Sequence, residues 1–271
     1  MLTQTERAVS LPMYALPEME DANSAFLQAL RQRLCIRGVD TGTLASDHDD
    51  DVFSASAKPL FTQICGYPLF KLYRGRYRML ATPHYSMPGC SGPNHRAFFM
   101  VRADDPAERL EDLQGRVFGC NSPLSNSGMN LPRLSLARIA GGQPFFSSVI
   151  VTGAHIKSLE HLDRARIDLC SVDSVTWGFF RKFRPAAAER YRVLAETVPS
   201  PSLPFVTSID TSESDAAVIT DALHEILNDP ETAKTSDGLA LNGLSVPDVV
   251  AYERLAQYER EAIELGFPEI S

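Results

Sequence analysis

The sequence lacks the features that mark membrane-spanning and nucleic-acid-binding proteins. No apolar run approaches the roughly 20 residues of a membrane-spanning helix. Acidic residues outnumber basic ones by 34 to 26, which argues against a nucleic-acid partner bound through a general basic surface. The first 21 residues contain no basic segment followed by an apolar run. We therefore expect a cytoplasmic chain, or a periplasmic one if a leader precedes this sequence.

Cysteine is scarce, and its spacing shows no metal-binding pattern. None of the five cysteines forms a C-x-x-C pair, so we expect no structural zinc site and no other metal centre. Their odd number and wide spacing predict reduced, mostly buried thiols, although a Cys65–Cys90 disulfide would fit an oxidising compartment. The acidic run Asp47–Asp51 lacks the glycine and distal glutamate of an EF-hand and is predicted to be a solvated loop.

Motifs of the common enzyme classes are also missing. The sequence contains no G-x-S-x-G, no H-E-x-x-H and no G-x-x-x-x-G-K-[ST] loop. It also lacks G-x-G-x-x-G, so a dinucleotide cofactor is unsupported. Cys120 could form a stabilised thiolate beside a helix start, but we favour a small apolar strand residue at this position. We expect a protein that is not an enzyme and holds no cofactor.

The sequence does contain a regular alternation of strand-like and helix-like segments. Residues 19–38 place apolar side chains at helical spacing and end at Gly38, which predicts a helix. Residues 212–266 are predicted to be mostly helical. Strands are predicted at 7–14, 59–66, 77–85, 97–103, 116–120, 145–153, 167–174, 191–198 and 203–209. This alternation indicates an α/β protein with mainly parallel sheets.

One segment, "NSPLSNSGMNLPRLSLARI" at 121–139, combines many hydrogen-bond donors with a helix start. It contains the capping residues Ser125, Asn126 and Ser127 and the glycine Gly128. A helix that begins here would present several N–H and O–H donors together, and Gly128 would let the backbone approach a ligand closely. Such a helix start can bind an anion. The alternative is an ordinary capped helix that follows a strand.

Three further segments give the chain a family resemblance. The segments "DLQGRVFGCNSPLSNSGMNLP", "VTGAHIKSLEHLDRARIDLCSVDSVTW" and "LAETVPSPSLPFVTS", in this order, resemble the phosphate/phosphonate-type periplasmic substrate-binding proteins of ABC transporters. The resemblance implies a two-lobed α/β type II periplasmic-binding-protein fold with the ligand in a cleft between the lobes. Lobe I would comprise 1–101 and 201–271, and lobe II 102–200. Ligand-driven hinge closure is the expected motion.

The resemblance also implies a set of ligand-binding residues. The oxyanion site of the family falls on Ser125, Asn126, Ser127 and Gly128, with Asn126 where the family more often has threonine. The other matched positions are two lobe I tyrosines, a histidine that contacts the oxyanion and an acidic residue that can pair with a ligand amine or a protonated oxyanion oxygen: Tyr14, Tyr67, His155 and Asp173. Each of these residues could instead have a purely structural role; Asp173, for example, could cap a helix. The loop at 86–96 could close over the ligand, and its Arg96 could add a positive charge.

The function implied by the resemblance is capture of a small oxyanion or phosphonate-like ligand for ABC-type uptake. The partners would be that small anion and an ABC permease, without nucleic acid and without a membrane span. Two alternatives remain open on the same fold. One is a cytoplasmic ligand sensor. The other is an enzyme of the thiamine-precursor type, although the cysteine-rich motif of those enzymes is absent.

Overall fold

The computed structural model describes residues 7–41 and 57–271. The predicted acidic loop at Asp47–Asp51 lies outside the described residues. Contacts divide the chain into two compact units, and each is described by itself. The first unit comprises the residues up to 86 together with 91–93 and 201–248, and the second comprises 87–90, 94–200 and 249–271.

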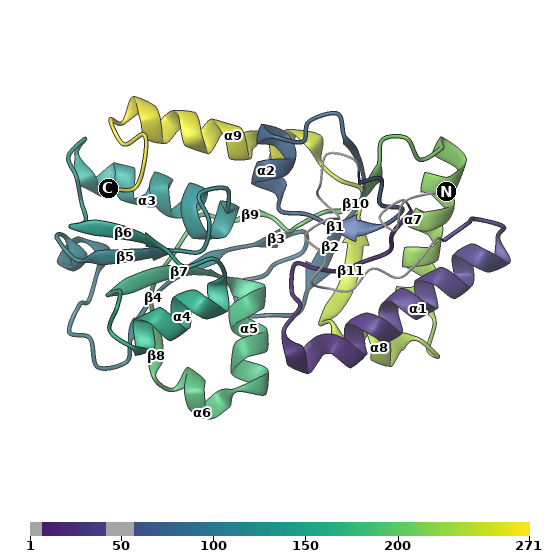
Figure 1. The fold of residues 1–271 in the computed structure, drawn as a ribbon, viewed down its shortest axis with the longest axis horizontal. Helices are drawn as coiled ribbons and strands as arrows, with labels where there is room; N and C mark the ends of the chain where they lie inside the picture. The colour runs from purple at the N-terminus through teal and green to yellow at the C-terminus, as the bar shows by residue number, and fades with distance from the viewer. Residues whose placement is uncertain (1–6, 42–56) are drawn as a thin grey trace. The chain divides into compact units, whose positions relative to one another are not determined.

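The first unit contains a four-stranded sheet in which every pairing is antiparallel. Its strand order is β1 (Thr62–Gln63), β10 (Phe205–Ser208), β2 (Tyr77–Tyr85), β11 (Leu241–Ser245). Its helices are α1 (Glu20–Ile36), α2 (Gly66–Lys71), α7 (Glu213–Asn228) and α8 (Ala233–Gly238), with a 3-10 turn at Pro17–Met19 before α1 (Figure 1).

Helix α1 confirms the helix predicted from apolar spacing. Phe26, Leu30 and Leu34 lie on one face and are fully buried, as expected for residues three or four positions apart on a helix. The chain turns away at Gly38, whose φ of 75° is a left-handed conformation that glycine adopts without steric cost. Burial of the apolar face, more than helix propensity, therefore stabilises α1.

Three segments of the first unit differ from the strand predictions. Residues 7–14 form no continuous strand and make one isolated bridge, from Val9 to Phe61, while the strand predicted at 59–66 is reduced to the two residues of β1. The tail at 212–266 is mostly helical, as predicted, but it also contains the strand β11, which pairs with β2. Asn242 and Gly243 are poor strand formers, so the pairing with β2 creates this strand where local preference does not.

The second unit contains a five-stranded mixed sheet. Its order is β6 (Ser148–Val151), β5 (Val117–Cys120), β7 (Leu169–Asp173), β4 (Ala97–Arg102), β8 (Tyr191–Glu196). Strand β5 is parallel to β6 and β7, whereas β4 is antiparallel to β7 and β8. The prediction of mainly parallel sheets is therefore wrong for the chain as a whole. Hydrophobic periodicity predicts that a segment is a strand, but it carries no information on the direction of its neighbours.

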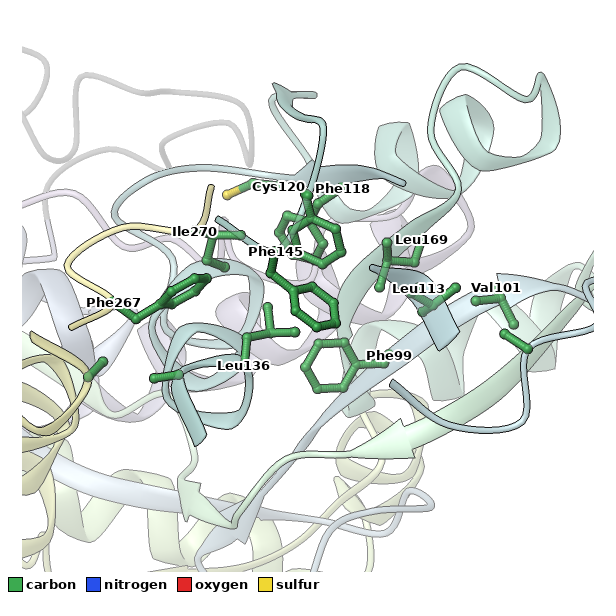
Figure 2. Packing of buried hydrophobic residues seen from close by; sticks show 14 residues of the cluster. Phe99, Val101, Leu113, Phe118, Cys120, Leu136, Phe145, Leu169, Phe267 and Ile270 are labelled. Carbon is green, nitrogen blue, oxygen red and sulfur yellow. The ribbon is translucent and has the colours of Figure 1, made fainter. Parts of the chain in front are cut away.

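Both faces of this sheet are covered by apolar side chains. Alternate residues of one strand point to opposite faces, so Phe99 joins a cluster with Phe118 and Leu136, whereas Phe98 and Met100 join a second cluster. Figure 2 shows the first cluster, in which the rings of Phe99, Phe118 and Phe145 lie together. The two-sided burial explains why the segment "AFFMVRA" reads as a continuous apolar run.

The helices of the second unit cover these two faces. They are α3 (Leu131–Ala140), α4 (His155–Asp163), α5 (Ser174–Phe183), α6 (Pro185–Ala188) and α9 (Val249–Glu264), with a 3-10 turn at Leu110–Leu113 and a π-helical turn at Asn126–Asn130. Helices α3 and α9 lie on one side of the sheet, and α4 and α5 lie on the other (Figure 1). The remaining short strands are β3 (Asn94–His95) and β9 (Ser200–Pro201).

This division differs from the predicted lobe boundaries in three segments. Residues 87–90, 94–101 and 249–271, expected in lobe I, group with the second unit. Strand β4 lies between β7 and β8 in the second unit's sheet. The C-terminal segment is attached to α3, because Asn130 Nδ2 donates to the Leu255 carbonyl at 2.8 Å and Arg133 Nη1 donates to the Pro268 carbonyl at 3.0 Å.

Candidate functional site

The predicted polar residues of the second unit gather at one edge of its sheet. Strands β5, β6 and β7 are parallel, so their carboxyl ends lie at the same edge. The π-helical turn follows β5, α4 follows β6, and α5 follows β7. Ligands of α/β proteins commonly bind beyond such carboxyl ends. The topology therefore brings Ser127, His155 and Asp173 to one side of the sheet from three separate segments.

Ser125 and the residues after it form a capped helix start that contains a π-helical turn. Ser125 Oγ accepts a hydrogen bond from the Gly128 N–H at 2.9 Å, which makes Ser125 the N-cap. The Ser125 carbonyl accepts from Asn130 N at 3.0 Å, five residues on. Across 7–41 and 57–271, no residue accepts from the Ser127 N–H. The predicted helix start is thus confirmed as structure, and the Ser127 N–H is a donor that an anion could use.

The side-chain amide of Asn126 is buried and hydrogen-bonded to other protein residues. Its side chain is 2% exposed, its Nδ2 donates to Ser200 Oγ at 3.0 Å, and its Oδ1 accepts from Asn130 Nδ2 at 3.1 Å. The Asn126 amide therefore connects the π-helical turn to Ser200, the first residue of β9. Such a satisfied buried amide fixes the position of the turn.

Gly128 is required by a neighbouring side chain. A Cβ atom placed on Gly128 would lie 1.7 Å from Asn121 Oδ1 and 3.1 Å from Ser125 Oγ. Its φ is not among the positive values of the chain, so backbone conformation does not demand glycine. The sequence predicted close approach of a ligand here, and the described contact is instead with Asn121.

His155 begins α4 and contacts Ser127 directly. Its Nε2 lies 3.0 Å from Ser127 Oγ, and its Nδ1 lies 3.2 Å from the Ser171 carbonyl oxygen. A carbonyl can only accept, so Nδ1 carries a hydrogen, and in the neutral ring Nε2 accepts the Ser127 hydroxyl proton. Burial of the ring lowers the pKa of His155, while the nearby Asp173 carboxylate acts to raise it. The neutral ring therefore holds the Ser127 hydroxyl in place.

Asp173 lies at the carboxyl end of β7 and caps α5. Its Oδ1 accepts from Val175 N at 2.8 Å and from Thr176 N at 3.3 Å. Its Oδ2 lies 2.8 Å from His95 Nδ1. Burial acts to raise the pKa of Asp173, but the charge on His95 and these hydrogen bonds outweigh it and lower the pKa. Asp173 is an ionised carboxylate with protein partners on both oxygens.

The two predicted tyrosines belong to the first unit. Tyr67 is 1% exposed, and its hydroxyl accepts from Lys71 Nζ at 2.9 Å. The Tyr14 ring meets the Tyr85 ring edge-on, with centroids 5.4 Å apart, and Gln63 Nε2 donates to the Tyr85 hydroxyl at 2.8 Å. Both tyrosines are packed side chains of that unit. Their part in ligand binding remains a prediction.

Two residues of this edge were missed by sequence reasoning. Ser171 donates its Oγ proton to the Ser127 carbonyl at 2.7 Å, which ties β7 to the turn. His95 pairs with Asp173 and lies in the loop at 86–96, in which the sequence points to Arg96. Arg96 Nη1 donates to the Thr197 carbonyl at 2.9 Å. No sequence signal pointed to His95, because its contact with Asp173 depends on the pairing of β4 with β7.

The cysteines are free thiols in this structure. All five are free, so the Cys65–Cys90 disulfide is not formed. Burial raises the pKa of the Cys120 thiol to about 11, which agrees with a small apolar strand residue and contradicts a stabilised thiolate. Within 7–41 and 57–271, no three His, Cys, Asp or Glu side chains group in a way that could hold a metal ion.

A family comparison is consistent with this arrangement. Residues 61–252 match a family described as ABC transporter, phosphonate, periplasmic substrate-binding protein. The chain belongs to this family. The membership confirms the family predicted from the sequence motifs and the role of a solute-binding protein. That role implies a small-molecule ligand and a permease partner, and the family is periplasmic. In the described part of the chain, no helix is long and apolar enough to cross a membrane.

Solved structures with a similar fold come from several bacteria. A binding protein component of an ABC phosphonate transporter from Pseudomonas aeruginosa has a TM-score of 0.79 at 15% identity, over 97% of this chain and 88% of that one. A Prochlorococcus marinus protein in complex with methylphosphonate has a TM-score of 0.75 at 12% identity, over 97% and 100%. A Xanthomonas citri protein bound to ATP has a TM-score of 0.70 at 15% identity, over 96% and 98%. These likenesses confirm the two-lobed α/β fold of type II periplasmic binding proteins. No curated protein matches the sequence.

Proposed function

We propose that this protein binds a small phosphorus oxyanion, of the phosphonate or phosphate class, and delivers it to an ABC permease. The observation that carries the proposal is the Ser127–His155 pair, 3.0 Å apart, beside a Ser127 N–H that no described residue accepts. A helix start that adds a hydroxyl and an imidazole to a free N–H suits a compact anion. The complex of the Prochlorococcus marinus protein with methylphosphonate supports this ligand class.

Neutral donors dominate the proposed site. Ser127 offers a hydroxyl and an N–H, and His155 becomes a second donor through Nε2 if it takes up a proton. A bound anion would favour that protonated form. Such a site can hold phosphate, phosphite or a phosphonate, whose oxygens share one tetrahedral geometry.

Hydrolytic catalysis is a second function that the contact between Ser127 and His155 suggests. A serine within 3.0 Å of an imidazole resembles part of a catalytic triad. In a triad, a carboxylate would orient the histidine through Nδ1, but here Nδ1 faces the Ser171 carbonyl and Asp173 pairs with His95. The arrangement therefore favours a binding role without turnover.

Family membership supports the partners and the compartment of this proposal. A substrate-binding protein of an ABC transporter releases its ligand to a permease. We propose that the protein works in the periplasm, and fractionation of the native protein tests this. A pool confined to the cytoplasm would instead support the ligand-sensor alternative.

The ligand class is tested by thermal unfolding of purified, ligand-stripped protein. The probes are phosphate, phosphite, sulfate, methylphosphonate and 2-aminoethylphosphonate. A probe at 100 times its dissociation constant should stabilise the native state by about 2.7 kcal/mol. Isothermal titration calorimetry of the best probe then gives the dissociation constant.

A matched pair of serine substitutions assigns the binding to this site. Ser127→Ala removes the hydroxyl beside His155 and should weaken binding about tenfold or more. Ser135→Ala is the control, because its Oγ only donates to the Leu131 carbonyl within the same helix, at 3.2 Å. If no phosphorus oxyanion raises the unfolding temperature, the proposed ligand class is wrong. Equal losses in the two variants would reject the proposed site.

A further inference from the structure

The carboxylate of Asp173 has no oxygen left without a protein partner. Oδ1 accepts two backbone N–H groups at the start of α5, from Val175 and Thr176. Oδ2 lies 2.8 Å from His95 Nδ1, and the side chain is 3% exposed. An ammonium group of a ligand would have to displace one of these donors from a buried carboxylate, which is costly. Asp173 is therefore poorly placed to recognise a ligand amine.

The imidazole of His95 has one nitrogen that the protein does not use. The side chain is fully buried, and Nδ1 lies 2.8 Å from Asp173 Oδ2 as an ion pair, although neither ring nitrogen has hydrogen-bond geometry to a described residue. Its other nitrogen, Nε2, is buried without a hydrogen-bond partner among the described residues. Buried polar nitrogens almost always have a partner, so one that lacks it requires an explanation. In an imidazolium paired with a carboxylate, Nε2 carries a hydrogen and can donate.

His95 lies at the same edge of the sheet as the Ser127–His155 pair. It comes just before β4, and Ala97 of that strand pairs with Asp173 at the end of β7. Ser171 and Asp173 are two residues apart on β7, so their side chains point to one face. One of them bonds the Ser127 carbonyl and the other bonds His95. The unpartnered nitrogen thus belongs to a side chain at the same edge of the sheet as the Ser127–His155 pair.

We propose that His95 is a further ligand-binding residue that donates through Nε2 to an anionic oxygen, and that Asp173 positions it. The proposal rests on the proposed function and narrows its ligand class to phosphorus oxyanions that carry no ammonium group for Asp173 to recognise. It replaces the expectation from the sequence that Asp173 contacts a ligand amine.

A purely structural role for His95 explains less. A histidine that only pairs with Asp173 would leave a buried nitrogen without a hydrogen-bond partner, which costs free energy. Because Nε2 is covered by protein atoms in this structure, an oxyanion reaches it only through a conformational change.

Calorimetric titration of two substitutions with methylphosphonate tests the role of His95. The Asn amide of His95→Asn can occupy the place of Nδ1 and keep the contact with Asp173, but it has nothing at the place of Nε2. We expect methylphosphonate to bind this variant about tenfold more weakly or worse. In His95→Gln the amide approximates Nε2 instead, and we expect it to recover part of the affinity.

The role of Asp173 is read from selectivity. Asp173→Asn keeps a residue that can cap α5, and it removes the charge that would attract an ammonium. We expect Asp173→Asn to lower the affinity for methylphosphonate and the affinity for 2-aminoethylphosphonate by the same factor, because Asp173 acts through His95. A loss specific to 2-aminoethylphosphonate would show that Asp173 binds the amine and would overturn the proposal.

The remaining outcomes separate this proposal from the proposed function. If Ser127→Ala loses methylphosphonate and His95→Asn binds it as the wild type does, the site is correct and the role of His95 is wrong. If the wild-type protein binds none of the phosphorus oxyanions, the proposed function and this inference both fail.

Discussion

The two units of this protein differ in the direction of their strands, and the difference explains where polar residues gather. In the first unit every strand pairing is antiparallel, so neighbouring strands end at opposite edges of the sheet. In the second unit, β5, β6 and β7 are parallel, and the three segments that follow them emerge at one edge. Parallel strands thus collect chain segments that are far apart in the sequence.

The candidate residues of the two units differ accordingly. Those of the first unit are aromatic, and Tyr67 is engaged by Lys71 on the same helix. Those of the second unit are hydroxyl, imidazole and carboxylate groups that bond one another across separate elements. We infer that the second unit supplies most of the specificity for the anionic group. Substitutions in the two units can test this contrast.

The largest effect is expected from Asp173→Ala, which unpairs a buried charge. The variant removes both the α5 cap and the partner of His95. Breaking a buried ion pair from one side costs about 3–5 kcal/mol, and we expect the free energy of unfolding, measured by urea denaturation, to fall by that order. Asp163→Ala is the control, because the Asp163–Arg190 pair is partly exposed and such pairs contribute about 1 kcal/mol or less. Equal losses would show that the Asp173–His95 pair does not stabilise the fold.

A smaller loss of stability is expected from Gly128→Ala. The added methyl would overlap Asn121 Oδ1, 1.7 Å away, and overpacking of this kind costs about 1–3 kcal/mol. Adding Asn121→Ala removes the overlapping amide and should restore part of the stability. A double-mutant cycle by urea denaturation measures this coupling. Additive losses would mean that Gly128 is needed for another reason.

Much of the second unit could be predicted from the sequence because its local signals agree with its packing. The segment at 97–103 reads as a buried strand because both of its faces are covered. The donor-rich motif predicts a helix start, and the structure has one at Asn126–Asn130. Fold family and helix starts are therefore accessible from residue order alone.

The parts that could not be predicted depend on contacts between distant segments. Strand β11 exists through its pairing with β2 and has weak strand preference of its own. Residues 249–271 join the second unit because Asn130 and Arg133 bond their backbone. The pairing of His95 with Asp173 likewise depends on β4 lying beside β7. No spacing in the sequence encodes these partners.

Ligand binding in the second unit is expected to depend on pH through His155. Burial lowers the pKa of His155, with Asp173 acting to raise it and His95 to lower it further, so the ring is neutral in the free protein above its usual pKa. A bound anion favours the imidazolium, so binding should take up close to one proton at pH 8. Affinity should then fall by up to about tenfold per pH unit, since one pKa unit corresponds to about 1.4 kcal/mol.

Titration calorimetry in buffers of different ionisation enthalpy measures this proton uptake. His155→Gln provides the control, because glutamine can donate to the ligand but does not titrate. Uptake that persists in His155→Gln would assign the proton to the ligand or to another residue.

The smallest effect is expected from Tyr67→Phe in the first unit. The substitution removes the hydroxyl that accepts from Lys71 Nζ at 2.9 Å and keeps the ring that lies 5.2 Å from the same ammonium. Loss of one such hydrogen bond costs about 0.5–1.5 kcal/mol. Lys71→Met removes the same bond, so the double variant should lose less than the sum of the single losses. If Tyr67→Phe weakened methylphosphonate binding as much as Ser127→Ala does, residues of both units would contribute equally to the affinity for the anion. The inference that the second unit supplies most of the specificity would then be wrong.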